Sequence, residues 1–493
     1  MRNGILRGLA PWLKSAGWVL ALLVLPSITW AQSLDLTQAE PTVPSPSTAG
    51  AGPRPPGPTT PPPMAPGYDP NAVPEVVMEG CDYFRDNSFA PRLASSPLRN
   101  GFGPFVTLPE DLYDNAACPA GEYPVATGPW VWGRVEYLYW ALSRPRFEAP
   151  APITSTRDNQ FGLLDQPETT ILYNGIPDGS TQHNGGRFSA GVWLSPNFLG
   201  LEASYFILEQ VSSMGHFGSD AAGSPIIARP VINALTGRES ALSVSFPGQF
   251  SGNILADAKV DMWGADANVI FNPFPGSVAN IGFLVGVRYL KLRDELSYVQ
   301  HTNVLGAGLA AFQGFPIGPP SQLRIADYFM TENRFEGVQG GLRLGHEWQR
   351  LYFYTTGKLA YGRTRQRLEI NGNTTFFDPD QPLIAPVTTS GGLLALNSNI
   401  GQFTRDVNSI MGELTVTLGY RLSRGFSVYG GYNFMYWTKV MRASDQIDRV
   451  IDPRQLPSSL QFDATATATQ PTPPFVNTDV WLQGIFAGAE LRY

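Results

Sequence analysis

Ten segments between residues 131 and 493 alternate apolar and other residues with a period of two, and this pattern constrains the fold more than any other feature. A period of two places successive side chains on opposite faces of a β-strand. In Val131–Ala141 the odd positions are apolar, aromatic or glycine, and the even positions include Arg134 and Glu136. The other nine segments lie near residues 187–195, 199–207, 264–271, 281–289, 338–345, 351–361, 413–421, 426–436 and 485–493.

The connections between these segments alternate in length. Four are short, near residues 196–197, 272–276, 347–349 and 423–425, and the others run to about 45–55 residues by this counting. Short turns at one end and long loops at the other are typical of bacterial outer-membrane barrels. We therefore predict an all-β fold, a transmembrane antiparallel up-and-down β-barrel of about ten strands with both termini in the periplasm. A further candidate strand, Leu242–Phe246, raises the number to about twelve if the loops contribute two strands.

The composition agrees with a surface that faces lipid. Charged residues make up 15% of the chain, against about 25% in typical soluble proteins. A closed barrel satisfies its backbone hydrogen bonds between strands, so its outer face can be apolar while its inner face stays polar. The alternative is a soluble barrel in which the same aromatic residues form a core. A sequence pI near 5.3 argues against a nucleic-acid partner.

The first 31 residues have the layout of a signal peptide. Arg2, Arg7 and Lys14 precede an apolar run over residues 17–25, and Ala31 stands at a plausible cleavage point. A membrane anchor is the competing interpretation, but the run is short and Pro26 ends it. Removal of this segment takes away three cations and changes the formal charge from −7 to −10. We expect an exported, acidic protein.

Two further regions separate the signal peptide from the barrel, which we place at residues 129–493. Residues 32–74 are rich in proline and read as a disordered spacer, although a proline-rich recognition motif is an alternative. Residues 75–128 form a small N-terminal region that contains the only two cysteines, Cys81 and Cys118. In an oxidising compartment we expect these two to form a disulfide.

The polar face of the predicted strands carries charges of both signs. A paired, plugged interior and a selective channel are both compatible with such a face, and ten strands lie near the narrow end of barrel sizes. Trp132, Trp140 and Trp193 do not follow the alternation. The candidates to line the lumen are Arg134, Glu136, Arg187, Glu202, Asp266, Arg288, Arg343, Lys358, Glu413, Arg421 and Glu490, together with Arg492.

Three segments, Gly133–Trp140, Gly286–Leu290 and Gly419–Leu422, and the closing Ile485–Tyr493 carry a family resemblance. Together they resemble the β-barrel porin-7 family, large outer-membrane proteins known chiefly from planctomycetes. The resemblance covers roughly Pro129–Tyr493 and implies an outer-membrane barrel, with no catalytic or ligand residues to carry over. The terminal aromatic on an alternating strand resembles an assembly signal of outer-membrane proteins, made of Ile485, Ala487, Ala489, Leu491 and Tyr493.

These features predict a porin that allows narrow passive diffusion of small solutes. The alternative is a non-conducting barrel that acts in structure, adhesion or surface recognition through its outer loops, near residues 154–182, 214–253, 302–323, 371–399 and 442–476. We predict no enzyme activity and no cofactor or metal, because His183, His216 and His301 fall in predicted outer loops and His346 adjoins a turn. Expected partners are outer-membrane lipid, the barrel-assembly machinery and a cell-envelope partner of the proline-rich segment.

Overall fold

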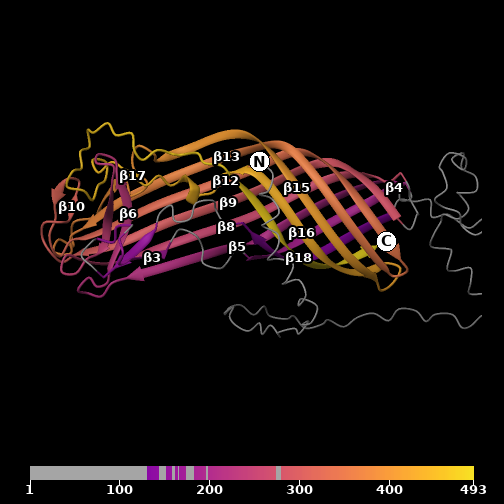
Figure 1. The fold of residues 1–493 in the computed structure, drawn as a ribbon, viewed down its shortest axis with the longest axis horizontal. Helices are drawn as coiled ribbons and strands as arrows, with labels where there is room; N and C mark the ends of the chain where they lie inside the picture. Colours follow the sequence, from indigo (N-terminus) through magenta and orange to yellow (C-terminus); the bar gives the residue numbers. More distant parts are fainter. Residues whose placement is uncertain are drawn as a thin grey trace, which may run out of the picture. The chain divides into compact units, whose positions relative to one another are not determined.

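The computed structural model describes residues 130–143, 152–157, 161–164, 166–173, 182–195, 198–273 and 279–493. Ten long strands form a closed antiparallel barrel, and Figure 1 shows them side by side. A further short strand, β14 (Val387–Ser390), pairs only with the outer end of β13. The barrel strands are β1 (Trp130–Leu142), β4 (Gln182–Ser195), β5 (Leu199–Gly218), β8 (Phe250–Phe271), β9 (Ala279–Val304), β12 (Gln322–Trp348), β13 (Leu351–Phe377), β15 (Gly401–Arg421), β16 (Phe426–Val440) and β18 (Thr478–Arg492).

The barrel closes between its first and last strands. β1 pairs with β18 from Trp132 opposite Arg492 to Leu142 opposite Leu482, and each remaining barrel strand pairs with its neighbours along the chain. Ten strands therefore complete the ring, as the alternation predicts. The possibility of twelve is wrong, because the candidate strand Leu242–Phe246 lies largely in β7 (Arg238–Ser245) and pairs with β6 (Ile226–Asn233) outside the barrel. We call the end with the short connections the turn end and the opposite end the loop end.

The long strands far exceed what a bilayer requires. β12 and β13 each have 27 residues, whereas a tilted strand crosses the hydrocarbon in about 9–11 residues. In the half nearer the turn end, outward-facing residues are apolar, such as Val285 and Val287 of β9, which are 67% and 58% exposed. In the half nearer the loop end, the same face carries charges such as Arg293. Only the half of each long strand that lies nearer the turn end therefore suits lipid.

The outward-facing apolar residues near the turn end form one continuous face, which we call the lipid-facing band. It includes Val135, Leu201, Val338, Leu359 and Leu414, all between 43% and 65% exposed. Nine aromatic residues at the two edges of this band are exposed in the same way, while Tyr289 and Phe426 are half-buried. The nine are Phe271, Phe353, Tyr420 and Tyr493 at the turn end, and Tyr139, Tyr205, Tyr361, Tyr436 and Trp481 at the other edge. Aromatic edges of this kind are typical of transmembrane barrels.

The predicted strand ends on the loop side are wrong for the long strands. β9 continues to Val304 rather than ending near residue 289, and β12 begins at Gln322 rather than near residue 338. The connection between them is therefore residues 305–321, much shorter than predicted. Beyond the lipid-facing band the pattern reverses, with charged residues outside and apolar residues inside, so the apolar face no longer continues. For the same reason His183, His216 and His301 lie in strands β4, β5 and β9 rather than in loops.

The loop end carries a folded assembly of its own, which we call the head (Figure 1). A five-stranded sheet combines β6 and β7 with β2 (Ile153–Thr156), β3 (Thr169–Tyr173) and β17 (Val450–Ile451). β10 (Ala311–Phe312) pairs with β11 (Phe315–Pro316), and η5 (Ser444–Gln446) is a short 3-10 helix. Residues 391–396 and 440–447 are fully buried inside the barrel mouth. Two long connections thus fold inward and fill the loop end.

Several predictions concern the N-terminal part of the chain. The signal peptide at 1–31, the spacer at 32–74 and the Cys81–Cys118 disulfide of residues 75–128 all lie outside the described residues. In the part of the chain that the structure describes, helices of the length and apolar character needed to cross a membrane are absent.

Candidate functional site

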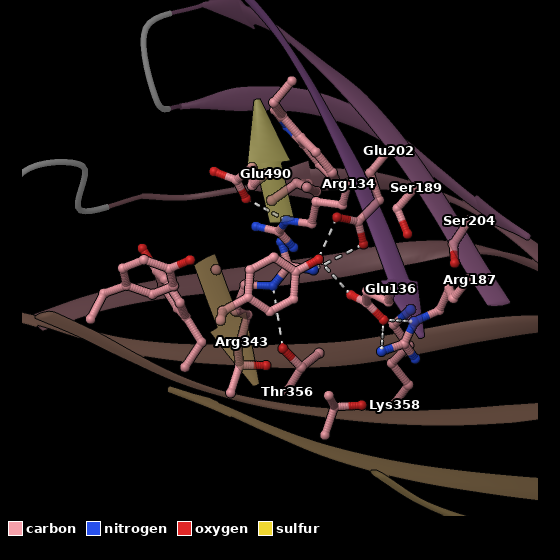
Figure 2. Close-up of a pocket in the computed structure, with 18 of the residues that line it drawn as sticks. Arg134, Glu136, Arg187, Ser189, Glu202, Ser204, Arg343, Thr356, Lys358 and Glu490 are labelled. Atoms are coloured by element: carbon pink, nitrogen blue, oxygen red, sulfur yellow. Dashed lines mark hydrogen bonds and ion pairs between the residues drawn. The ribbon is translucent and has the colours of Figure 1, made fainter. Parts of the chain in front are cut away.

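A cavity of about 670 Å³ lies inside the barrel and reaches its turn end. Arg424, in the connection between β15 and β16, and Asn272, just after β8, belong to its lining, which places its mouth among the short turns. Figure 2 shows the side chains that project into it from several strands. All twelve predicted lumen residues contribute to this lining: Arg134, Glu136, Arg187, Glu202, Asp266, Arg288, Arg343, Lys358, Glu413, Arg421, Glu490 and Arg492.

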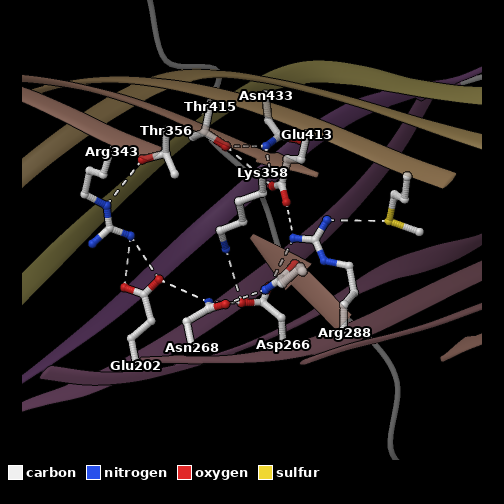
Figure 3. Close-up of polar contacts among 12 residues, drawn as sticks. Glu202, Asp266, Asn268, Arg288, Arg343, Thr356, Lys358, Glu413, Thr415 and Asn433 are labelled. Atoms are coloured by element: carbon white, nitrogen blue, oxygen red, sulfur yellow. Dashed lines mark hydrogen bonds and ion pairs between the residues drawn. The ribbon is translucent and has the colours of Figure 1, made fainter. Parts of the chain in front are cut away.

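A network of ion pairs crosses the cavity between strands that are distant in sequence (Figure 3). Arg343 of β12 donates to both carboxylate oxygens of Glu202 of β5, at 2.9 and 3.0 Å. Asp266 accepts from Lys358 Nζ at 3.2 Å and from Arg288 Nη2 at 3.3 Å. Arg288 also pairs with Glu413 of β15. Each charge in this network has a partner of opposite sign, so the network neutralises itself.

Two amides extend the network, and sequence reasoning did not single them out. Asn268 donates to Asp266 Oδ1 at 2.7 Å and to Glu202 Oε1 at 3.4 Å. Gln339 donates through Nε2 to Asn268 Oδ1 at 2.5 Å. Asn268 shares the inward phase of β8 with Asp266, and that phase is the signal that could have identified it.

A second group of ion pairs lies along β1 and its neighbours. Glu490 of β18 is 1% exposed and pairs with both Arg134 and Arg492. Glu136 pairs with Arg187 and accepts a hydrogen bond from the Tyr429 hydroxyl at 2.9 Å. These contacts join β1 to β4, β16 and β18, and therefore hold the seam where the barrel closes.

Two tryptophans that break the sequence alternation point into the barrel. Trp132 is 7% exposed, and the Arg134 guanidinium lies 4.5 Å from the centre of its ring. Trp140 is 1% exposed and packs on Phe206 with ring centroids 5.4 Å apart. Gly484 leaves room for Trp140, because a Cβ at this glycine would lie 2.7 Å from the indole Cδ1. The third, Trp193, is half-buried and also lines the cavity.

A layer of apolar side chains closes the cavity on the side away from the turns. We call it the apolar seal; nine of the ten barrel strands contribute to it. A side chain that lines an open water-filled pore is exposed to water, but Trp437, Phe335 and Leu292 are 0% exposed. The seal consists of Leu138, Trp140, Leu142, Phe206, Leu208, Val260, Met262, Leu290, Leu292, Phe335, Ala360, Met411, Met435, Trp437, Val480, Leu482 and Phe486. Three members of the same buried cluster lie outside the seal: Tyr352 and Tyr429 line the cavity nearer the turn end, and Val440, the last residue of β16, begins the loop segment that follows.

The inward-folded loop segment 440–447 covers the apolar seal from the loop side. Asn333 of β12 donates to Met441 O at 2.7 Å and accepts from Met441 N at 2.8 Å. Asp294 of β9 accepts from Arg442 Nε at 2.7 Å and from Ala443 N at 3.2 Å. The lumen is therefore closed by two layers in series, the apolar seal and a buried loop segment that polar contacts hold in place.

Glu490→Gln should destabilise the barrel, because it leaves two arginines around a buried group that no longer carries a negative charge. Breaking a buried ion pair on one side costs about 3–5 kcal/mol. We expect a loss of about 3 kcal/mol in the free energy of unfolding, measured by urea titration in lipid vesicles. Glu336→Gln is the matched control, because Glu336 is 60% exposed and should cost less than about 1 kcal/mol. Equal losses in the two variants would contradict a role of Glu490 in holding the seam.

The four histidines lie in four different barrel strands. Within the described ranges, three or more His, Cys, Asp or Glu side chains do not gather into a possible metal site. His183 Nδ1 lies 3.1 Å from the backbone oxygen of Glu209, which suits an N–H donor. His216, His301 and His346 lie in β5, β9 and β12 respectively.

His183 should make stability depend on pH. It lies one residue beyond the partner of Tyr139, outside the lipid-facing band, and burial lowers the pKa of its imidazole. An imidazole whose pKa is lowered by folding binds a proton more readily in the unfolded state than in the folded state. Its contribution to the free energy of unfolding is therefore complete above about pH 6.5 and is lost as the pH falls below that value. We expect the urea midpoint to fall more between pH 7.5 and 5.5 in the wild type than in His183→Gln. Parallel curves would contradict this assignment.

The comparison with protein families identifies the barrel. Residues 132–493 match the family described as "Putative beta barrel porin-7". The chain belongs to the beta barrel porin-7 family. The match begins within β1 and runs to the last residue, so it covers the whole closed barrel and the head. Together with the lipid-facing band, family membership points to the outer membrane.

Solved structures similar to this beta barrel porin-7 chain share low sequence identity with it. The outer membrane protease OmpT from Escherichia coli is 10% identical, with 74% of this chain and 97% of OmpT covered and a TM-score of 0.31. A Pseudomonas aeruginosa FadL homologue is 8% identical over 74% of this chain and 90% of its own, with a TM-score of 0.20. An anion-selective porin from Comamonas acidovorans is 8% identical over 74% and 100%, with a TM-score of 0.12. Among curated proteins, none matches.

Proposed function

We propose that this chain is an outer-membrane barrel that does not conduct small solutes in its resting state and that presents a rigid head at the cell surface. The apolar seal is the observation that carries the proposal. Its largest side chains, Trp140, Phe335 and Trp437, are no more than 1% exposed. An aqueous channel requires a continuous path of polar, hydrated surface, and ten strands leave little space beyond their own side chains.

Narrow passive diffusion, the function that the family description suggests, is the alternative. The polar cavity at the turn end supports it, since the cavity already holds about 670 Å³ of space. Solutes would have to pass the apolar seal and then the segment 440–447, both of which are buried. Diffusion through this lumen therefore requires both layers to move.

The proposed orientation places the turn end in the periplasm and the head outside. Short turns on the periplasmic side and longer loops outside are the rule for bacterial barrels. The C-terminal strand β18 and the start of β1 meet at the turn end, where Val131 and Tyr493 exchange backbone hydrogen bonds. This orientation agrees with export by the N-terminal signal peptide and with a spacer that reaches into the cell envelope.

The head gives the proposed recognition function its physical basis. Arg449 of the loop before β17 donates to Glu239 of β7 at 3.0 and 2.8 Å, and β17 pairs in parallel with β6. Loops held on a rigid scaffold are where binding functions concentrate. Ligands, partner proteins or phage are the classes that such a surface can bind.

A non-enzymatic role fits the same geometry. The porin family to which the chain belongs supports it, and His183 is occupied by a backbone contact rather than by a carboxylate. The likeness to the protease OmpT, at 10% identity and a TM-score of 0.31, does not indicate protease activity.

Planar-bilayer recording of the refolded full chain tests the proposal. We expect no reproducible conductance steps from protein that shows heat-modifiable migration on a detergent gel, which reports a closed barrel. Stepwise conductance from the wild type would overturn the closed state in favour of passive diffusion. A heat-insensitive protein that fractionates with soluble material would overturn the membrane assignment itself.

A further inference from the structure

The lipid-facing band ends abruptly on the loop side of β9, β12 and β13. The last outward-facing apolar row consists of Val287, Val338 and Tyr361, which are 58%, 65% and 57% exposed and lie directly opposite one another. Tyr289, Glu336 and Arg363 form the next row towards the loop end. The change from apolar to charged side chains therefore occurs within two residues on β12 and β13 and within four residues on β9.

The following row places three cations side by side, and we call it the cationic row. Lys291 of β9 lies opposite Arg334 of β12, and Arg334 lies opposite Arg365 of β13. Trp263 of β8 and Asp406 of β15 stand at the two ends of the row. Like charges directly opposite on neighbouring strands destabilise a sheet. Some interaction must therefore offset this repulsion.

Carboxylates within the sheet offset the repulsion only in part. Glu332, in the next row towards the loop end, forms ion pairs with Lys291 at 2.7 Å and with Arg334 at 2.6 Å. Asp406 lies 3.8 Å from Arg365 and 3.4 Å from Arg363. Arg365 is 60% exposed and Arg334 is 44% exposed, so both guanidinium groups remain open to solvent.

The neighbouring rows are balanced, which singles out the cationic row. Towards the turn end, Arg363 faces Glu336 at 3.8 Å. Towards the loop end, the next row holds Arg293 and Arg367 together with the carboxylates Asp261 and Glu332. Of these three rows, only the cationic row holds more cations than carboxylates. It has three cations, Lys291, Arg334 and Arg365, and one carboxylate, Asp406.

We propose that the cationic row binds the phosphate group of an anionic lipid in the leaflet on the loop side. The row lies four residues beyond the last outward-facing apolar row and two residues beyond the row of Tyr289, at the depth of a lipid headgroup. Guanidinium groups bind phosphate through paired hydrogen bonds. At the end of the row Trp263 stacks on Tyr289 with ring centroids 5.0 Å apart, and aromatic rings favour the same interfacial depth. A phosphate between Arg334 and Arg365 would also supply the missing negative charge.

Lipid binding to the refolded full chain in detergent tests the proposal, with native mass spectrometry as the readout. Phosphatidic acid is the probe, and phosphatidylcholine is the lipid without net charge. Each basic residue near a membrane surface contributes about 1 kcal/mol to binding anionic lipid. The double variant Arg334→Gln/Arg365→Gln should therefore weaken phosphatidic acid binding on the order of ten-fold or more and leave phosphatidylcholine binding unchanged.

The matched control removes two cations from the same outer face, further from the lipid. Lys259→Gln/Arg324→Gln changes the net charge equally, and Lys259 pairs with Asp257 at 2.9 Å while Arg324 contacts Asn373. We expect this control to bind phosphatidic acid within about two-fold of the wild type. Equal weakening in both double variants would show a general charge effect and overturn the site. Displacement of the lipid by inorganic phosphate would overturn the lipid as its ligand.

A barrel that conducts in planar bilayers can still bind phosphatidic acid at the cationic row. A barrel that does not conduct but binds phosphatidic acid equally well without Arg334 and Arg365 would overturn the lipid site and leave the proposed closed state intact.

Discussion

A variant that opens both layers of the closed lumen is expected to conduct ions where the wild type is silent. The apolar seal is opened by Trp140→Ala, Phe335→Ala and Trp437→Ala, which remove the bulk of three side chains that are at most 1% exposed. The covering segment is released by Asp294→Ala and Asn333→Ala, because these two side chains hold Met441–Ala443. We expect stepwise conductance in planar bilayers from the fivefold variant.

Either set of changes alone should leave the barrel silent. The two layers lie in series, so water gains a continuous path only when both are open. A control with Val135→Ala, Val338→Ala and Leu359→Ala trims side chains of the lipid-facing band that are 57–65% exposed. It tests whether general weakening of the barrel causes leakage, and we expect it to remain silent. Conductance in the variant with only the seal opened would contradict the role of the loop segment as a second barrier. A fivefold variant that folds into a heat-modifiable barrel but does not conduct would contradict the assignment of both layers as the barriers to conduction.

Asp327→Ala is expected to release part of the head and to cost several kcal/mol of stability. Asp327 of β12 is 1% exposed, and its Oδ1 accepts backbone N–H groups of Leu393, Leu394 and Ala395 at 2.8–2.9 Å. Its Oδ2 accepts from Arg229 Nη2 at 2.6 Å. Removing one partner of a buried charge pair costs about 3–5 kcal/mol, and the three amides lose their acceptor as well.

Hydrogen exchange locates this effect, and urea titration gives its size. Exchange at residues 393–395 should rise sharply in Asp327→Ala, and Asp327→Asn should lie between this variant and the wild type because it keeps an acceptor oxygen. Asp380→Ala removes an exposed carboxylate from the connection after β13 and should change stability by less than about 0.5 kcal/mol. Unchanged exchange at 393–395 in Asp327→Ala would rule out Asp327 as the anchor of this loop segment.

The ten strands and their four short turns could be predicted because the surroundings on the two sides of the barrel wall, lipid outside and a polar lumen inside, determine the type of residue at each strand position. Lipid requires apolar side chains such as Val285 and Val287 outside, and the polar interior places Arg288, the residue after Val287, on the other face. This alternation appears directly in the sequence. It also placed all of the predicted charged lumen residues on the side of the wall where the cavity lies.

The loop-side half of the strands was missed because the alternation changes phase there. In β9 the residues Leu290, Leu292 and Leu296 point inward and are at most 2% exposed, while Lys291 and Arg293 lie on the outer face. The unbroken series of outward-facing apolar and aromatic residues of β9 ends at Tyr289. The same reversal marks where lipid ends, so it predicts the edge of the membrane once the barrel is known.

The sequence by itself determined that the chain forms a ten-stranded lipid-facing barrel with short turns at one end, because period-two alternation is a local property that each strand satisfies alone. Only the tertiary structure decided that the lumen is closed. Whether an inward residue such as Trp140, Phe335 or Trp437 lines a pore or fills it depends on what projects from the opposite wall. Those partners lie on strands far apart in sequence, and no local pattern records how closely they meet across the lumen.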